Sequence, residues 1–203
     1  IGSDTFENGE VKLRKGPILN CAIRGGFGVL DEINMAKNES LAVLHAVLDF
    51  RRTIDLPGYD RINLHEATRF IGTMNYGYAG TREMNEALAS RFMVLHMPVI
   101  SAENLQKLIK DKYPTLKPEY ISQFATLFDE IRKKCEGGEI STRSLDLRGL
   151  ISCIGMMKKG LGVTKALEMG LINKCFDEYE RQLVLDIVSA RLPESLSGES
   201  IFS

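Results

Sequence analysis

The pattern of apolar residues changes near residue 100, and this change constrains the fold more than any other feature of the sequence. Before it, short apolar runs alternate with helical patterns and with turn residues, which is typical of a parallel sheet covered by helices. After Ser101, apolar residues recur only at helical spacing. The sequence therefore predicts an α/β part over residues 1–100 and an all-helical part over residues 101–203.

Hairpins and short strands are expected in the first part. Asn8-Gly9 is a strong signal for a two-residue hairpin turn, and a second hairpin is expected around Pro57-Gly58, over residues 52–64. Asn38 is expected to cap a helix that includes Leu41, Leu44 and Leu48. Apolar runs without alternation predict three buried parallel strands, at residues 27–30, 68–74 and 93–99.

Helix signals dominate the second part. Ser101 is a cap for a helix over residues 102–112, and Pro118 fits the first turn of a helix that runs to about Cys135. Three further helices are expected at roughly residues 144–158, 163–175 and 178–192.

Composition excludes several classes of protein. With 44% hydrophobic and 26% charged residues, the chain is neither disordered nor fibrous. A net charge of -1 provides no global basic field for nucleic acid or anionic membranes. No apolar run approaches the roughly 18 residues that span a bilayer, and no signal peptide opens the sequence. Four cysteines without metal-ligand spacing are expected to be buried free thiols, which favours the cytoplasm.

Polar side chains that could act on a nucleotide follow two of the expected strands. Asp31 and Glu32 come directly after the first strand, and Asn75 follows the second. Ligands of α/β sheets bind at the carboxyl ends of the strands. Phosphoryl transfer needs a carboxylate for magnesium and a group that positions water. Taken singly, each of these residues has an ordinary alternative, because polar residues commonly end strands.

Two arginines are further candidates. Arg91 lies near the end of a helical stretch at residues 85–92. A guanidinium there could bind, through paired hydrogen bonds, the phosphate of a nucleotide held by a neighbouring subunit. Arg143 lies within Ser141-Thr142-Arg143, where a helix start favours anions. The alternatives are an arginine that offsets a helix dipole and a solvated arginine beside a cap.

The order of these features resembles the second half of AAA+ ATPases, in particular the dynein-related branch that contains the MoxR and CbbQ/NirQ proteins. Residues 27–36, Phe-Gly-Val-Leu-Asp-Glu-Ile-Asn-Met-Ala, resemble the Walker B signature of that branch, and residues 70–75 resemble its sensor 1. Residues 85–92 resemble its arginine-finger segment, and residues 141–143 its sensor 2. The hairpins resemble insertions that precede Walker B and sensor 1.

The resemblance implies an incomplete AAA+ parallel-sheet core over residues 1–100 and a helical lid over residues 101–203. It implies that Asp31 assists Mg²⁺, Glu32 polarises water, Asn75 orients that water, Arg91 acts in trans, and Arg143 senses the γ-phosphate of ATP. Arg82 is a weaker second candidate for action in trans. A cytoplasmic, chaperone-like hexamer is implied, which remodels a protein client, in this branch often one with a von Willebrand A domain.

The sequence departs from that family in one respect, because no G-x-x-x-x-G-K-[ST] motif is present. We therefore expect that an upstream segment with the P-loop belongs to the same protein, and that residues 1–203 alone bind ATP very weakly or not at all. Two other functions stay open. One is a scaffold or interaction fragment without a P-loop, and the other is a nucleic-acid-acting NTPase of the restriction-motor type, which the near-neutral charge disfavours.

Overall fold

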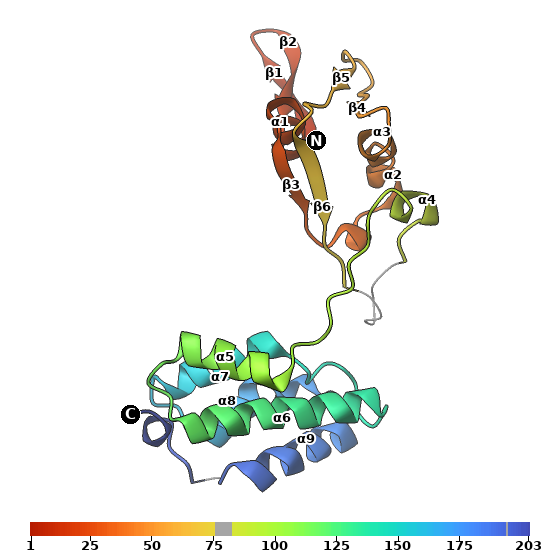
Figure 1. The fold of residues 1–203 in the computed structure, drawn as a ribbon. Helices are drawn as coiled ribbons and strands as arrows, with labels where there is room; N and C mark the ends of the chain where they lie inside the picture. The colour runs from red at the N-terminus through yellow and green to blue at the C-terminus, as the bar shows by residue number, and fades with distance from the viewer. Residues whose placement is uncertain (76–82, 194) are drawn as a thin grey trace. The chain divides into compact units, whose positions relative to one another are not determined.

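The structure, a computed structural model, describes residues 1–75, 83–193 and 195–203 (Figure 1). The chain forms two compact units, Ile1–His96 and Met97–Ser203. The first is mixed α/β, with a small parallel sheet and two hairpins. The second is built from helices in its described residues.

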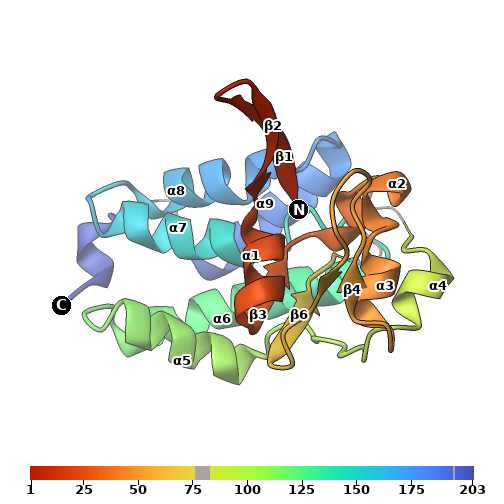
Figure 2. The same ribbon diagram turned by 90° about the horizontal axis from the view of Figure 1, so that it is seen from above.

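The first hairpin confirms the turn signal. Strands β1 (Gly2–Glu7) and β2 (Glu10–Lys15) pair antiparallel, with Glu7 opposite Glu10. Asn8 and Gly9 connect them with φ angles of 52° and 84°. Two consecutive positive φ angles define the type I′ turn, whose twist matches that of the flanking strands. The turn end of the hairpin projects from the rest of its unit (Figure 2).

A two-stranded parallel sheet forms the centre of the first unit. Strand β3 (Gly26–Leu30) pairs with β6 (Thr68–Gly72), as the sequence predicts. Helix α1 (Pro17–Arg24) packs against this pair. Gly28 permits the close approach of Phe70, because a Cβ at Gly28 would lie 2.6 Å from the Phe70 ring.

Only one face of this sheet is buried within the described residues, so the prediction that these parallel strands are buried is wrong for the other face. Leu30 and Phe70 pack against the core of the unit. On the other face, the exposed fractions of Phe27, Val29 and Ile71 are 75%, 62% and 47%. A parallel strand loses contact with water on both sides only where both faces of its sheet are covered, and the described residues cover one.

The third predicted strand is also wrong. Residues 93–99 follow helix α4 (Glu86–Ala89) and have no strand structure, and the exposed fractions of Met93 and Leu95 are 98% and 86%. A strand exists only where a neighbour completes its hydrogen-bond ladder. No strand in the described part of the chain pairs with this segment.

The second predicted hairpin is confirmed but is short. Strands β4 (Thr53–Ile54) and β5 (Ile62–Asn63) pair antiparallel. The helix expected before it is divided into α2 (Asn38–Leu41) and α3 (Leu44–Leu48). Asn38 is not its cap, because the backbone is still extended at Lys37, which occupies the N-cap, and is helical from Asn38 onward.

The five predicted helices of the second part are present. Ser101 caps the first by accepting a hydrogen bond from the Asn104 N–H, and Pro118 opens the second. Buried side chains from all five helices form one cluster, which includes Phe124 and Ile154. The helices are α5 (Ala102–Lys112), α6 (Pro118–Glu136), α7 (Leu147–Met157), α8 (Val163–Gly170) and α9 (Glu178–Arg191).

The cysteines are all free thiols, and two of them, Cys153 and Cys175, are buried. Burial raises the pKa of the Cys135 and Cys153 thiols to about 11, so both stay protonated at neutral pH and are poor nucleophiles. Among the described residues, no helix combines the length and the apolar character that crossing a membrane requires.

Candidate functional site

The candidate site lies at the carboxyl ends of β3 and β6. These strands run parallel with Leu30 opposite Gly72, so the residues that follow them meet at one edge of the sheet. The backbones stay connected beyond the strands. The Thr73 N–H donates to the Leu30 carbonyl at 3.0 Å, and the Ile33 N–H donates to the Thr73 carbonyl at 2.9 Å.

The Thr73 hydroxyl links the two carboxylate-bearing residues. It donates a hydrogen bond to a carboxylate oxygen of Asp31 and accepts one from the Glu32 N–H at 3.2 Å. A hydrogen bond to a charged acceptor is stronger than a neutral one, so this contact restrains the Asp31 carboxylate. Asp31 and Glu32 are both exposed and thus accessible to a ligand.

Glu32 has an unusual backbone conformation. Its φ and ψ angles of 50° and 45° lie in the left-handed region, which costs a residue with a side chain on the order of 1 kcal/mol or more. The turn separates β3 from the short 3-10 helix η1 (Ile33–Met35). Residues held in such conformations cluster at functional sites, which fits the role expected for Glu32.

Asn75 is attached to the same edge through its main chain. The side chain of Asn34, which is 4% exposed, donates from Nδ2 to the Asn75 carbonyl at 3.0 Å. This bond places Asn75 beside the turn that carries Glu32, while Asn75 itself is exposed. Three of the predicted site residues, Asp31, Glu32 and Asn75, therefore gather at one edge of the sheet.

Arg91 makes its contacts elsewhere in the first unit. One terminal nitrogen donates to the carbonyl oxygen of Ala87, and the other lies 3.7 Å from the carboxylate of Asp49. Asp49 also binds Arg51, with 2.6 Å between Oδ2 and Nη2. The hydrogen bond from the Arg51 side chain lowers the pKa of Asp49 to about 2, so this carboxylate is ionised at neutral pH.

Arg143 lies in the helical unit, and its predicted place at the start of a helix is wrong. Helix α7 begins at Leu147, and its cap is Asp146, which accepts a hydrogen bond from the Gly149 N–H at 2.9 Å. Arg143 belongs to the preceding turn, with its guanidinium carbon 4.9 Å from the centre of the Phe176 ring. Arg82, the second candidate for action in trans, lies outside the described residues, as do Tyr76 and Tyr78, which directly follow the sensor 1 segment in sequence.

The strand-end residues suit magnesium bound together with a nucleotide. The described part of the chain has no group of three or more His, Cys, Asp or Glu side chains that could hold a metal ion by itself. Magnesium keeps several waters and is commonly bound by one or two carboxylates together with substrate phosphates. Asp31, restrained by Thr73, provides a carboxylate of this kind.

Sequence reasoning missed three residues that shape these contacts. Thr73 and Asn34 lie within the segments that resemble sensor 1 and Walker B. The position of a hydroxyl or an amide close to the end of a strand could have indicated that these side chains hold the site together. Asp49 precedes Arg51 by two residues, the spacing at which an aspartate accepts from its own backbone, and the Arg51 N–H does donate to it at 3.0 Å.

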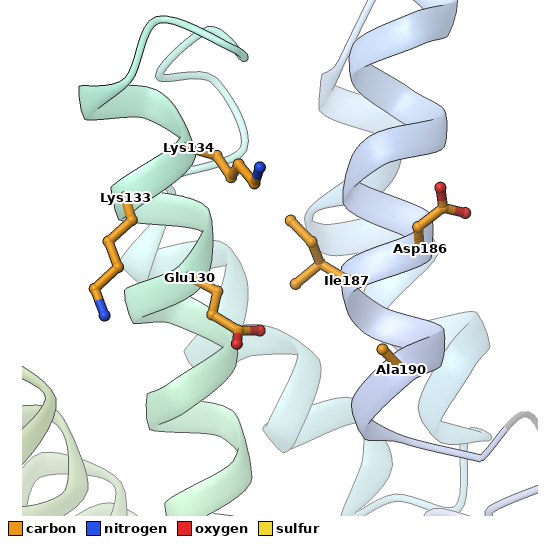
Figure 3. A pocket seen from close by; sticks show the side chains of 6 residues that line it. All are labelled: Glu130, Lys133, Lys134, Asp186, Ile187 and Ala190. Carbon is orange, nitrogen blue, oxygen red and sulfur yellow. The ribbon is translucent and has the colours of Figure 1, made fainter.

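A groove in the helical unit has a different character. It lies between α6 and α9, and Ile187 points from α9 toward α6 (Figure 3). Its charged residues already have partners. Glu130 pairs with Arg191, Lys133 with Asp129 at 3.0 Å and Lys134 with Glu139 at 2.7 Å, while Asp186 accepts from Gln182 at 2.8 Å. The groove is therefore not assigned a ligand.

Known proteins are similar to most of this chain. The AAA domain (dynein-related subfamily) matches residues 1–92. Uncharacterized proteins of Staphylococcus aureus, from strains bovine RF122 / ET3-1, NCTC 8325 / PS 47 and COL, are 33% identical over 180 residues, 88% of this chain and 68% of each relative. With the strand-end geometry above, these similarities show that the chain belongs to the AAA+ ATPase family, in which its first 92 residues match the dynein-related subfamily.

Proposed function

We propose that the chain is the ATPase module of a ring-forming AAA+ protein of the MoxR and CbbQ/NirQ type, which uses ATP hydrolysis to remodel a protein partner. The observation that carries this proposal is the edge where Thr73 joins Asp31 to Glu32, with Asn75 held alongside. A carboxylate that holds magnesium and a group that positions the attacking water are among the groups that nucleotide hydrolysis requires.

Each residue has a separate role in this proposal. Magnesium, when bound with ATP, neutralises charge on the phosphates. Asp31 would hold the ion, and the Thr73 hydroxyl would keep the Asp31 carboxylate in place. Glu32 would accept a proton from the attacking water, and Asn75 would orient that water. Arg91 would contact the γ-phosphate of ATP bound to a neighbouring subunit. Arg143, in the helical lid, would sense the γ-phosphate of ATP.

ATP turnover by the full-length protein tests the proposal, with Glu32→Gln beside the wild type. Glu39→Gln is a matched control, because Glu39 is an exposed glutamate on the adjacent helix α2. We expect Glu32→Gln to retain ATP binding and to lose turnover by about 10²-fold or more, while Glu39→Gln matches the wild type. A wild type without turnover, or an undiminished rate in Glu32→Gln, would overturn the proposal.

A further inference from the structure

The side chain of Arg91 is held at two points within its own unit. The first is the Ala87 carbonyl, one turn earlier in the chain, and the second is the Asp49 carboxylate at 3.7 Å. The Arg91 side chain is 28% exposed, so it is neither fully buried nor free in solvent. Arginine has several rotatable bonds, and two contacts at its head restrict the orientations of the guanidinium.

The carboxylate of Asp49 is itself held by hydrogen bonds from Arg51, independently of Arg91. Its Oδ1 accepts from both the backbone N–H and the Nε of Arg51 at 3.0 Å, and its Oδ2 accepts from Nη2 at 2.6 Å. The side chain of Asp49 is 14% exposed, whereas that of Arg51 is 51% exposed. The more exposed Arg51 therefore restrains the carboxylate of Asp49 by hydrogen bonds on its solvent-facing side.

Apolar packing brings Asp49 and Arg91 together independently of their charges. Asp49 directly follows α3, and Arg91 closely follows α4. Leu88 of α4 and Leu44 and Val47 of α3 belong to one buried cluster, and each is at most 3% exposed. Removal of the charge at Asp49 is therefore expected to leave the contact between the helices in place and to remove one of the two contacts of the guanidinium.

On the basis of the proposed function, we propose that Asp49 is the positioning residue for Arg91. It holds the guanidinium in the orientation that meets the terminal phosphate of a nucleotide bound to a neighbouring copy of this chain. A group that stabilises charge during reaction acts best when its orientation is fixed beforehand. The ion pair at 3.7 Å is longer than a hydrogen bond, and arginine has five N–H donors, so phosphate contact does not require the pair to break.

Mixing of subunits tests this assignment in the full-length protein. Glu32→Gln removes a group that acts in its own subunit, whereas Arg91→Ala removes one that acts on the next. If Asp49 acts through Arg91, then Asp49→Asn should behave like Arg91→Ala when subunits are mixed. Mixtures of Asp49→Asn with Glu32→Gln should regain turnover, because some interfaces combine an intact Glu32 with an intact Asp49–Arg91 pair. Mixtures of Asp49→Asn with Arg91→Ala should regain none.

The rate of Asp49→Asn alone gives a second readout. We expect kcat to fall about 10-fold or more while KM changes little, because misorientation acts on the reaction rather than on binding. Asp55→Asn is the matched control, since Asp55 forms an exposed ion pair with Arg61 at 3.1 Å in the same unit, and its rate should match the wild type. Asp49→Glu retains the charge and should retain more of the rate, which keeps the test available if Asp49→Asn folds poorly.

The outcomes separate this inference from the proposed function. A wild type without ATP turnover defeats the proposed function. If the wild type and Glu32→Gln behave as expected, a wild-type rate in Asp49→Asn defeats the positioning role alone. Regained turnover in mixtures of Asp49→Asn with Arg91→Ala, or none in mixtures with Glu32→Gln, also defeats it, because Asp49 would then act within its own subunit.

Discussion

The helical unit buries far more side chains than the α/β unit, although the two are of similar length. Its cluster contains 26 buried residues, whereas that of the α/β unit contains eight. A helix satisfies its backbone internally and needs only one face covered. A parallel strand needs neighbours along its edges and cover on both faces. In the described residues, the helices of the second unit have their apolar faces covered, whereas the parallel strands of the first unit have only one face covered.

The largest expected effect is the loss of stability of the helical unit when one of its buried side chains is truncated, with no effect on the α/β unit. Phe124 of α6 is fully buried, so Phe124→Ala should lower the free energy of unfolding of the helical unit by about 3–5 kcal/mol. Denaturant unfolding followed by far-UV circular dichroism measures the loss, and amide hydrogen exchange locates it. Protection of β3 and β6 should be unchanged.

The matched control for Phe124 is Phe176→Ala. Phe176 is 81% exposed and contacts the guanidinium of Arg143. Its replacement should cost at most about 1 kcal/mol, the scale of an exposed cation–π contact. An equal loss in the two variants, or a loss of exchange protection in β3 and β6 with Phe124→Ala, would contradict the contrast between the units.

A smaller effect is expected within the α/β unit, between the two faces of its sheet. Phe70 packs against the buried cluster, whereas Phe27 on the adjacent strand is 75% exposed. Phe70→Ala should lower the free energy of unfolding by about 2 kcal/mol, and Phe27→Ala should change it by less than about 0.5 kcal/mol. Urea unfolding of both variants measures the difference. Equal costs would mean that both faces are covered in the full-length protein.

The same contrast explains what the sequence could predict. Ser101 and Pro118 mark helix starts through local chemistry, so the helices at these positions were predicted well. The segment 93–99 has strand composition but no strand structure, because strand pairing depends on residues distant in sequence. Asp146 was missed as a cap because Ser141, slightly upstream, is an equally good cap residue.

The candidate site shows the same division. Asp31, Glu32 and Asn75 were identifiable because they directly follow strand patterns, and the parallel pairing of β3 and β6 brings them to one edge. The contact of Thr73 with Asp31 and that of Asp49 with Arg91 were not identifiable. Each joins segments about 40 residues apart, and spacing along the chain does not specify which side chains meet across such a distance.

The smallest expected effect tests whether the helical unit satisfies its charges locally. Burial alone raises the pKa of Asp146, but hydrogen bonds from Lys174 and the Gly149 N–H outweigh burial, and the net pKa is lowered. A carboxylate with a lowered pKa contributes stability above its unfolded pKa of about 3.9, and the contribution disappears as pH falls through the folded value. Asp146→Asn should therefore cost about 0.5–1 kcal/mol at neutral pH, because the pair with Lys174 is partly exposed.

Two further variants divide the contribution of Asp146 into its parts. Asn is as good an N-cap as Asp, so Asp146→Asn removes mainly the ion pair, whereas Asp146→Ala also removes the cap and should cost about 1–2 kcal/mol. In the Lys174→Gln background, Asp146→Asn should cost little. Denaturant unfolding at neutral and at acidic pH measures each term. A cost of Asp146→Asn that persists below the folded pKa of Asp146 would show that Asp146 stabilises α7 through packing rather than through charge, and the helical unit would then depend less on local electrostatics than its contacts indicate.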